Sequence, residues 1–289
     1  MRRRKVRVVL AGFFLVSIWS VFYWLFAGLP SPDDLQAYTT APSSKIYDRY
    51  GRLLYEMPPP YTGSHTPVTL DEIPEALRQA TIATEDASFY ENPGMDIRGI
   101  VRSVWINVQG GEVLAGGSTV TQQVVRVLMF TPEERASRTL RRKLRELLLA
   151  LRVTRRYSKD EILTLYFNET YYGNMAYGVE AAAQAYFSKH VRDLDLAECA
   201  MIAGLAQTPA FYNPLEDMKA AKDRQAVVLG LMVKQGYITE EQLRLAHEER
   251  LAFASAPFAI YAPHFVMYVR GLLERELGLD RLAAGGLEI

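Results

Sequence analysis

The sequence predicts a mainly α-helical protein preceded by one N-terminal transmembrane helix. Two observations point to this: apolar residues recur at helical spacing from residue 69 onward, and residues 8–29 contain no charged residue. The composition adds that the chain folds, because 49% hydrophobic and 23% charged residues are ordinary for a folded protein and exclude global disorder. The 289 residues are enough to bury a large core.

Charge and cysteine content exclude several kinds of function. Lys+Arg and Asp+Glu each number 33, so the net charge is zero, which excludes a globally basic nucleic-acid-binding protein. Cys199 is the only cysteine, which excludes an intrachain disulfide and a Cys-rich metal site. The four histidines show no ligand spacing, so no metal-ligating residues are predicted.

The N-terminal residues predict a membrane anchor. A basic head, residues 1–7, precedes the uncharged stretch 8–29, which as a helix would be about 33 Å long and could cross a bilayer core. Trp19, Tyr23 and Trp24 suit the outer interface. The positive-inside rule places the head in the cytoplasm and the chain after residue 29 outside the cytoplasmic membrane. The alternative is a cleaved signal peptide, but the apolar stretch exceeds the usual length and no A-x-A site follows it.

Residues 30–68 are predicted to be an extracytoplasmic tether. Repeated prolines, including the run 58–60, forbid long helices here. Two short alternating stretches, Lys45–Tyr47 and Arg52–Tyr55, are candidate strands.

Residues 69–250 are predicted to form the helical domain. Capping sequences begin helices at Thr69, Ser158 and Asp195, and glycine pairs frame a loop at 110–117. The remaining helices follow from apolar periodicity at about 97–108, 120–128, 140–151, 181–187, 220–235 and 240–250. The leucines at 140, 144, 147, 148 and 151 form one apolar stripe.

Residues 251–289 differ in character from the domain before them. A helix is expected at 265–277, and Gly285–Ile289 resembles the beginning of a strand that has no evident partner.

Basic residues dominate residues 135–156, where Glu146 alone opposes nine of them. On a helix, Arg142 lies four residues and Lys143 three residues from Glu146, so both can reach its carboxylate. Arginine suits phosphate oxygens, which indicates a site for a phosphate-bearing substrate. Two alternatives are a solvated basic face with an ordinary ion pair and a basic face lying on anionic lipid headgroups.

Two further stretches carry side chains suited to catalysis or to ligand binding. Glu85 and Asp86 end a predicted helix next to Phe89, where a carboxyl group can act as general base or acid; a solvent-facing acidic turn is the alternative. Residues 117–123 supply hydroxyl and amide groups where a loop enters a helix, which suits anions or sugar hydroxyls. The alternative there is a plain N-cap, and the segment lacks the Gly-Lys-Ser/Thr of a P-loop.

In order, these stretches and one more resemble the motifs of a known family. They are Glu85-Asp86-x-x-Phe89, Gly117-Ser118-Thr119-x-Thr121-Gln122-Gln123, Arg142-Lys143-x-x-Glu146 and Lys159-x-x-Ile162-Leu163-x-x-Tyr166-x-Asn168. Together they resemble the peptidoglycan glycosyltransferase domain (transglycosylase, glycosyltransferase family 51) of class A penicillin-binding proteins. The likeness covers about residues 45–250.

The resemblance implies a lysozyme-like fold with a small membrane-associated jaw, and polymerisation of lipid II outside the cytoplasmic membrane. By this likeness Glu85 is the general base that activates the acceptor 4-hydroxyl, and Glu146 is the second essential carboxylate. Arg142 and Lys143 would hold the pyrophosphate, with Arg126 assisting where the family usually has Lys. The other substrate-binding residues implied are Asp86, Phe89, Gly117, Ser118, Thr119, Thr121, Gln122, Gln123 and Asn168.

The resemblance also implies partners. A divalent cation, Mg²⁺ or Mn²⁺, would assist, without a dedicated protein cage and without an organic cofactor. Lipid II, the growing glycan strand, membrane lipids and other cell-wall synthesis or division proteins are the expected partners, and nucleic acid is not. Residues 251–289 would begin a linker toward a transpeptidase domain that the sequence does not contain.

Two positions depart from the family pattern, and two other functions compete with it. Asn92 stands where the family usually has His, and Thr164 where it usually has Glu. A lytic, lysozyme-like enzyme would share the fold but needs no pyrophosphate site, so the Arg142-Lys143 pair argues against it. A non-catalytic lipid II-binding scaffold has no use for the two carboxylates, which argues against that function.

Overall fold

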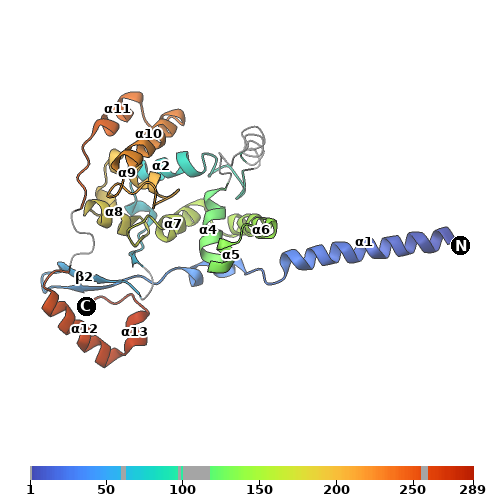
Figure 1. Cartoon of the computed structure of the whole chain (residues 1–289), viewed down its shortest axis with the longest axis horizontal. Helices are drawn as coiled ribbons and strands as arrows, with labels where there is room; N and C mark the ends of the chain where they lie inside the picture. Colours follow the sequence, from blue (N-terminus) through green and yellow to red (C-terminus); the bar gives the residue numbers. More distant parts are fainter. Residues whose placement is uncertain (1, 60–62, 97–98, 100–117, 255–259) are drawn as a thin grey trace.

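The computed structural model describes residues 2–59, 63–96, 99, 118–254 and 260–289, and it is mainly helical, as predicted. Figure 1 shows a body of packed helices from which α1 projects. The predicted helix at 97–108 lies almost wholly outside the described residues. The helices are α1 (Arg2–Phe26), α2 (Glu75–Glu85), α4 (Val120–Met129), α5 (Pro132–Ala136), α6 (Leu140–Arg156), α7 (Lys159–Glu169), α8 (Val179–Phe187), α9 (Leu196–Leu205), α10 (Met218–Lys234), α11 (Glu240–Glu248), α12 (Pro263–Leu277) and α13 (Leu279–Ala283), with 3₁₀ turns at Pro32–Tyr38, Leu70–Glu72 and Val191–Asp193.

The core forms around α9, which packs against α2, α10, α8 and α11. Every residue of α9 from Ala197 to Leu205 is buried, and its small side chains allow the neighbouring helices to approach closely. A second group, α4 with α6 and α7, packs side by side and continues the same core. The predicted capping boxes begin α7 at Ser158 and α9 at Asp195, which confirms the sequence interpretation there.

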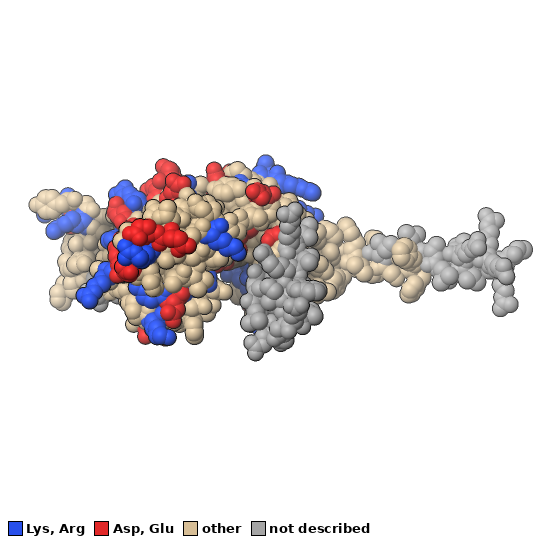
Figure 2. Space-filling view, turned by 90° about the horizontal axis from the view of Figure 1, so that it is seen from above, with Lys and Arg blue, Asp and Glu red and all other residues tan. Residues whose placement is uncertain are grey.

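Helix α1 includes most of the predicted transmembrane stretch. Its described side chains are largely exposed and apolar, for example Phe13 (73% exposed) and Trp19 (66%). Figure 2 shows acidic and basic side chains interspersed over the body, whereas the side chains of α1 that the structure describes are uncharged. Within the described ranges no helix combines the length and hydropathy needed to cross a membrane, so the predicted transmembrane helix is not confirmed.

Two small sheets flank the helices. Strands β1 (Ser44–Tyr47) and β2 (Leu53–Met57) form an antiparallel hairpin, as expected. The C-terminal residues lie parallel to β1, with the Lys45 N–H donating to the Leu287 carbonyl (2.7 Å) and the Ile289 N–H to the Lys45 carbonyl (2.9 Å). The strand-like C-terminus therefore does have a partner, which the sequence analysis did not find because that partner is some 240 residues earlier.

The segment predicted as a tether packs against the domain. Leu35 is fully buried, and its backbone N–H donates to the Tyr157 hydroxyl (3.0 Å). Strand β3 (Ser64–His65) is buried and pairs in parallel with β4 (Ala176–Tyr177). Residues 30–68 thus contribute to the core as well as connecting α1 to the body.

Helix α6 buries a different face from its leucine stripe. Leu140 is 72% exposed and Leu144, Leu147 and Leu148 are only partly buried. The buried residues are instead Arg145, Glu146, Leu149, Ala150 and Val153. Periodicity identifies residues that share a face, but it does not say which face a neighbouring helix covers.

Candidate functional site

Side chains of helix α4 connect the two predicted catalytic carboxylates. Glu85 is the last residue of α2, and Glu146 lies in the second turn of α6. Adjacent glutamines on α4 connect them, because Gln123 contacts Glu85 while Gln122 contacts Lys143, which in turn contacts Glu146. Thr119 is the N-cap of α4 and accepts from the Gln122 N–H, so it fixes the start of the helix that carries both glutamines.

Glu85 is a partly buried carboxyl group with few stabilising partners. Burial raises its pKa above the ordinary glutamate value, and the neighbouring Asp86 adds to the rise. The Gln123 side-chain amide donates to it at 2.7 Å, and with the charge of Arg224 this opposes the rise without cancelling it. Glu85 is therefore suited to accept a proton.

Glu146 is fully buried and held by three cations. Arg126 donates from Nε and Nη2 (both 3.1 Å), Arg142 from Nη1 (2.5 Å) and Lys143 from Nζ (2.6 Å). Burial alone would raise the pKa of Glu146, but the hydrogen bonds from Arg126 and Lys143 outweigh it and hold the pKa below its usual value. Three positive groups against one carboxylate leave a net charge of +2.

This cluster presents donors at its rim as well as inside. The side chains of Arg126 and Lys143 are about one-third exposed. Lys143 Nζ also donates to the Ser118 hydroxyl (2.8 Å) and to Gln122 Oε1 (2.7 Å), and Arg126 Nη2 donates to Ser118 (3.3 Å). The predicted residues from two motifs therefore form one positively charged site suited to phosphate oxygens.

Asp86 ties the end of α2 to the start of α4. Its carboxylate accepts from Asn92 Nδ2 (2.8 and 3.1 Å) and from the Val120 N–H (3.2 Å). Burial raises its pKa, and these hydrogen bonds oppose the rise. Asn92, where the family usually has His, is thus the amide that satisfies a buried carboxylate.

We expect Asn92→Ala to lower the free energy of unfolding by about 2 kcal/mol, because buried Asp86 would lose its side-chain amide donor. Denaturant-induced unfolding measures the change. The exposed neighbour Glu91 supplies the control, and Glu91→Ala should cost less than about 0.5 kcal/mol. Equal unfolding midpoints for the two variants would contradict this role of Asn92.

Four other predicted site residues do not offer a surface to a ligand. Phe89 and Thr121 are fully buried, and the Lys159 ammonium lies 4.6 Å from the Phe89 ring centroid. Thr119 donates from its hydroxyl to the Gly94 carbonyl (2.8 Å). Asn168 clamps Val68 through both its amide groups (2.9 and 3.0 Å), so its contacts support the fold. Gly117 lies outside the described residues.

Two residues contribute that the sequence analysis gave no role. Arg224 on α10 lowers the pKa of Glu85 by its charge and lies over the Tyr212 ring (5.5 Å). Lys159 donates to Asn92 Oδ1 (3.4 Å) and its charge opposes the raised pKa of Asp86. Lys159 stands within a quoted motif, but no local pattern connects Arg224 with a residue about 140 positions earlier. Thr164 donates to the Asp160 carbonyl one turn back in α7 (2.7 Å).

The carboxylates of Glu146 and Asp86 do not fit a protein-held divalent cation. Both oxygens of Glu146 already accept from cations, and those of Asp86 accept from Asn92 and Val120. Among the described residues no group of three or more His, Cys, Asp or Glu side chains could hold a metal ion. The predicted absence of a protein cage stays a prediction for the whole chain.

Comparisons with known proteins identify the family. Residues 51–233 match the family model described as Transglycosylase. Penicillin-binding protein 1A of Aquifex aeolicus (strain VF5) is 38% identical over 88% of this chain and 34% of its own length, and that of Escherichia coli (strain K12) is 41% identical over 88% and 29%. The chain spans about a third of the length of these relatives.

A crystal structure of penicillin-binding protein 1A from Haemophilus influenzae is also similar, with a TM-score of 0.48 and 27% sequence identity over 84% of this chain and 26% of that chain. The family match covers well over half of the chain, and the sequence relatives cover most of it. The chain therefore belongs to the transglycosylase family.

Proposed function

We propose that the protein is a peptidoglycan glycosyltransferase that polymerises lipid II into β-1,4-linked glycan strands. The observation that carries the proposal is the pairing, across α4, of a carboxyl group with a raised pKa and a cluster of net charge +2. Family membership and relatives named penicillin-binding protein 1A support the same reaction.

In the proposed reaction Glu85 removes the proton from the 4-hydroxyl of the acceptor GlcNAc. That oxygen forms a bond to C1 of the donor MurNAc while the bond from C1 to the pyrophosphate oxygen breaks, so the configuration at C1 inverts from α to β. The raised pKa makes Glu85 a stronger base than an ordinary glutamate, as its proposed role requires. Undecaprenyl pyrophosphate leaves with the electron pair of the broken bond.

The basic cluster stabilises the charge that develops on the leaving pyrophosphate. Arg142, Lys143 and Arg126 provide the positive charge, and Ser118 and Gln122 orient Lys143. Glu146 keeps the three cations together in fixed positions, and its low pKa keeps it ionised for that purpose. Without this carboxylate the cations would repel one another.

We further propose that α1 anchors the catalytic domain to the outer face of the cytoplasmic membrane. The exposed apolar side chains of α1 and the basic residues at its start support this orientation. An anchored enzyme would stay in the plane that holds its lipid-linked substrate.

The deciding experiment incubates the full chain with labelled lipid II in detergent and, separately, with preformed peptidoglycan. A ladder of glycan chains supports the glycosyltransferase. Cleavage of the preformed polymer without a ladder would instead identify a lytic enzyme. Lipid II binding without either reaction would identify a scaffold.

The pH dependence of polymerisation should report on Glu85. Because the base must be ionised, the rate should fall as pH falls through the Glu85 pKa, which lies above the ordinary glutamate value. Gln123→Leu removes a hydrogen bond that favours the charged form, so it should shift this acidic limb to higher pH. Initial rates at a series of pH values measure the shift. Gln79→Leu, which removes the hydrogen bond between Gln79 and the exposed Glu75 on the same helix, is the control, and equal limbs in the two variants would contradict the assignment.

A further inference from the structure

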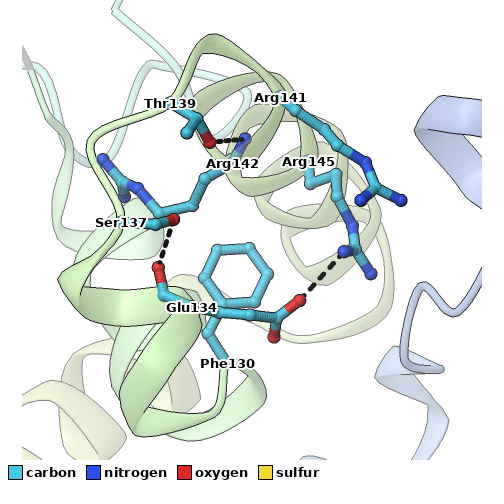
Figure 3. A pocket seen from close by; sticks show the side chains of 7 residues that line it. All are labelled: Phe130, Glu134, Ser137, Thr139, Arg141, Arg142 and Arg145. Carbon is cyan, nitrogen blue, oxygen red and sulfur yellow. Dashed lines mark hydrogen bonds and ion pairs between the residues drawn. The ribbon is translucent and has the colours of Figure 1, made fainter.

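A small arginine-lined cavity lies between the segment that follows α4 and the first turns of α6. Its volume is about 90 Å³, several times the ~15 Å³ that holds one water. Figure 3 shows Arg141 and Arg145 on one side of the Phe130 ring and Arg142 on the other. Glu134 supplies the one carboxylate among the lining residues. We call this cavity the arginine pocket.

The arginines of the pocket have unused hydrogen-bonding capacity. Arg145 pairs with Glu134 (2.9 Å) and Arg142 pairs with Glu146, yet the Nε atoms of both arginines are buried and have no acceptor among the residues that the structure describes. Arg145 as a whole is only 6% exposed. Buried donors ordinarily find acceptors, so this pocket is built for an anion and differs from a solvated basic face.

Other groups of the pocket suit an oxyanion. The Thr139 hydroxyl accepts from the Arg142 N–H, and a hydroxyl that accepts can also donate its own proton. Three arginine residues line the cavity, against the single acidic residue Glu134. A tetrahedral phosphate would receive donors from several sides.

The pocket lies where α1 meets the body. Arg141 Nε donates to the Trp24 carbonyl (2.8 Å) with its guanidinium over the Trp24 ring (5.6 Å), and Arg145 Nη2 donates to the Gly28 carbonyl (2.6 Å). The described side chains of α1 before this point are mostly apolar and exposed. Aromatic and arginine side chains at such a junction are typical of the level of lipid headgroups.

We propose that the arginine pocket binds the phosphate group of an anionic membrane lipid. The pocket adjoins the charged site around Glu146 and shares Arg142 with it, whereas Lys143, Arg126 and Ser118 do not line the pocket. The inference shares with the proposed function the membrane anchor and Arg142, and the variants that test it are at neither. A bound lipid phosphate would hold α6, and with it the basic cluster, at a fixed height above the bilayer.

The proposal is tested by titrating dihexanoyl phosphatidylglycerol into the full chain in uncharged detergent micelles. Tryptophan fluorescence measures binding, because Trp24 lies against Arg141. We expect saturable binding that Arg145→Gln weakens at least about tenfold. Arg155→Gln removes the same charge from an exposed position on α6 and should weaken binding no more than about twofold.

Glu134→Gln should change the affinity for the lipid in the opposite direction. It removes the competing carboxylate while glutamine keeps the capping box of α5, so binding should tighten about threefold. This variant also keeps the proposal testable if Arg145→Gln does not fold. Equal weakening by Arg145→Gln and Arg155→Gln, or no change with Glu134→Gln, would overturn the pocket assignment.

Two ligand controls identify the source of the phosphate. Dihexanoyl phosphatidylcholine has no net charge and should bind at least about tenfold more weakly than phosphatidylglycerol. Inorganic phosphate should compete weakly; if it bound as tightly as the lipid, the occupant would be a free phosphate and the lipid proposal would fail. Polymerisation activity is not a readout here, so this test can fail while the proposed function stands.

Discussion

Replacing Glu85 by glutamine is expected to reduce lipid II polymerisation about 10³-fold, within the 10²- to 10⁴-fold range of general acid–base catalysis. Glutamine keeps the shape of the side chain and can still contact Gln123, but it cannot accept the proton of the acceptor hydroxyl. Burial, which raises the pKa of Glu85 in the wild type, does not oppose a neutral amide. The fold should therefore survive.

Glu75→Gln is the matched control for this prediction. Glu75 begins the same helix α2 and is exposed, with Gln79 as its partner (2.7 Å). Gel separation of the labelled glycan ladder gives the rate for each variant, and circular dichroism verifies the fold. Wild-type polymerisation by Glu85→Gln would exclude Glu85 as the base.

Glu146→Gln should lower both activity and stability. The neutral amide would leave Arg126, Arg142 and Lys143 converging without a compensating charge, and breaking a buried ion pair costs about 3 kcal/mol or more. Cations that move apart no longer hold the pyrophosphate, so polymerisation should fall at least about 10²-fold.

Denaturant-induced unfolding and the lipid II assay measure the two effects separately. Glu248→Gln breaks an exposed ion pair with Arg244 and should cost less than about 1 kcal/mol with unchanged activity. If Glu146→Gln unfolded at the same denaturant concentration as Glu248→Gln, Glu146 would not hold the cluster together.

Local spacing predicted the charged cluster on α6. Arg142, Lys143 and Glu146 fall within one turn of one helix, so helix geometry alone brings them together. The capping sequence at Ser158 likewise acts over three residues. Such features depend on the nearest neighbours in the chain, and the sequence contains all the information they need.

Contacts between distant segments could not be predicted in the same way. The hydrogen bond from Gln123 to Glu85 joins residues 38 positions apart, and the effect of the Arg224 charge on the Glu85 pKa depends on how α10 packs. The leucine stripe of α6 illustrates the same limit, because the neighbouring helices bury the face that contains Glu146 and leave much of the stripe exposed or partly buried. The resemblance to a family supplied the roles of residues that no local rule connects.

The pairing of β1 with the C-terminal residues bears on the order in which the chain can fold. The Leu287 N–H donates to the Ser44 hydroxyl across 243 residues, so this contact closes a loop as long as most of the protein and carries a large entropic cost. A ribosome delivers the hairpin well before the segment near Glu288 that pairs with it. During that interval one edge of β1 is an unpaired strand, and Lys45 provides a charge of the kind that protects such edges from association with other chains. This pairing can therefore form only after residues 287–289 have been synthesised, and proteolysis of nascent chains near residues 44–47 would report when it occurs.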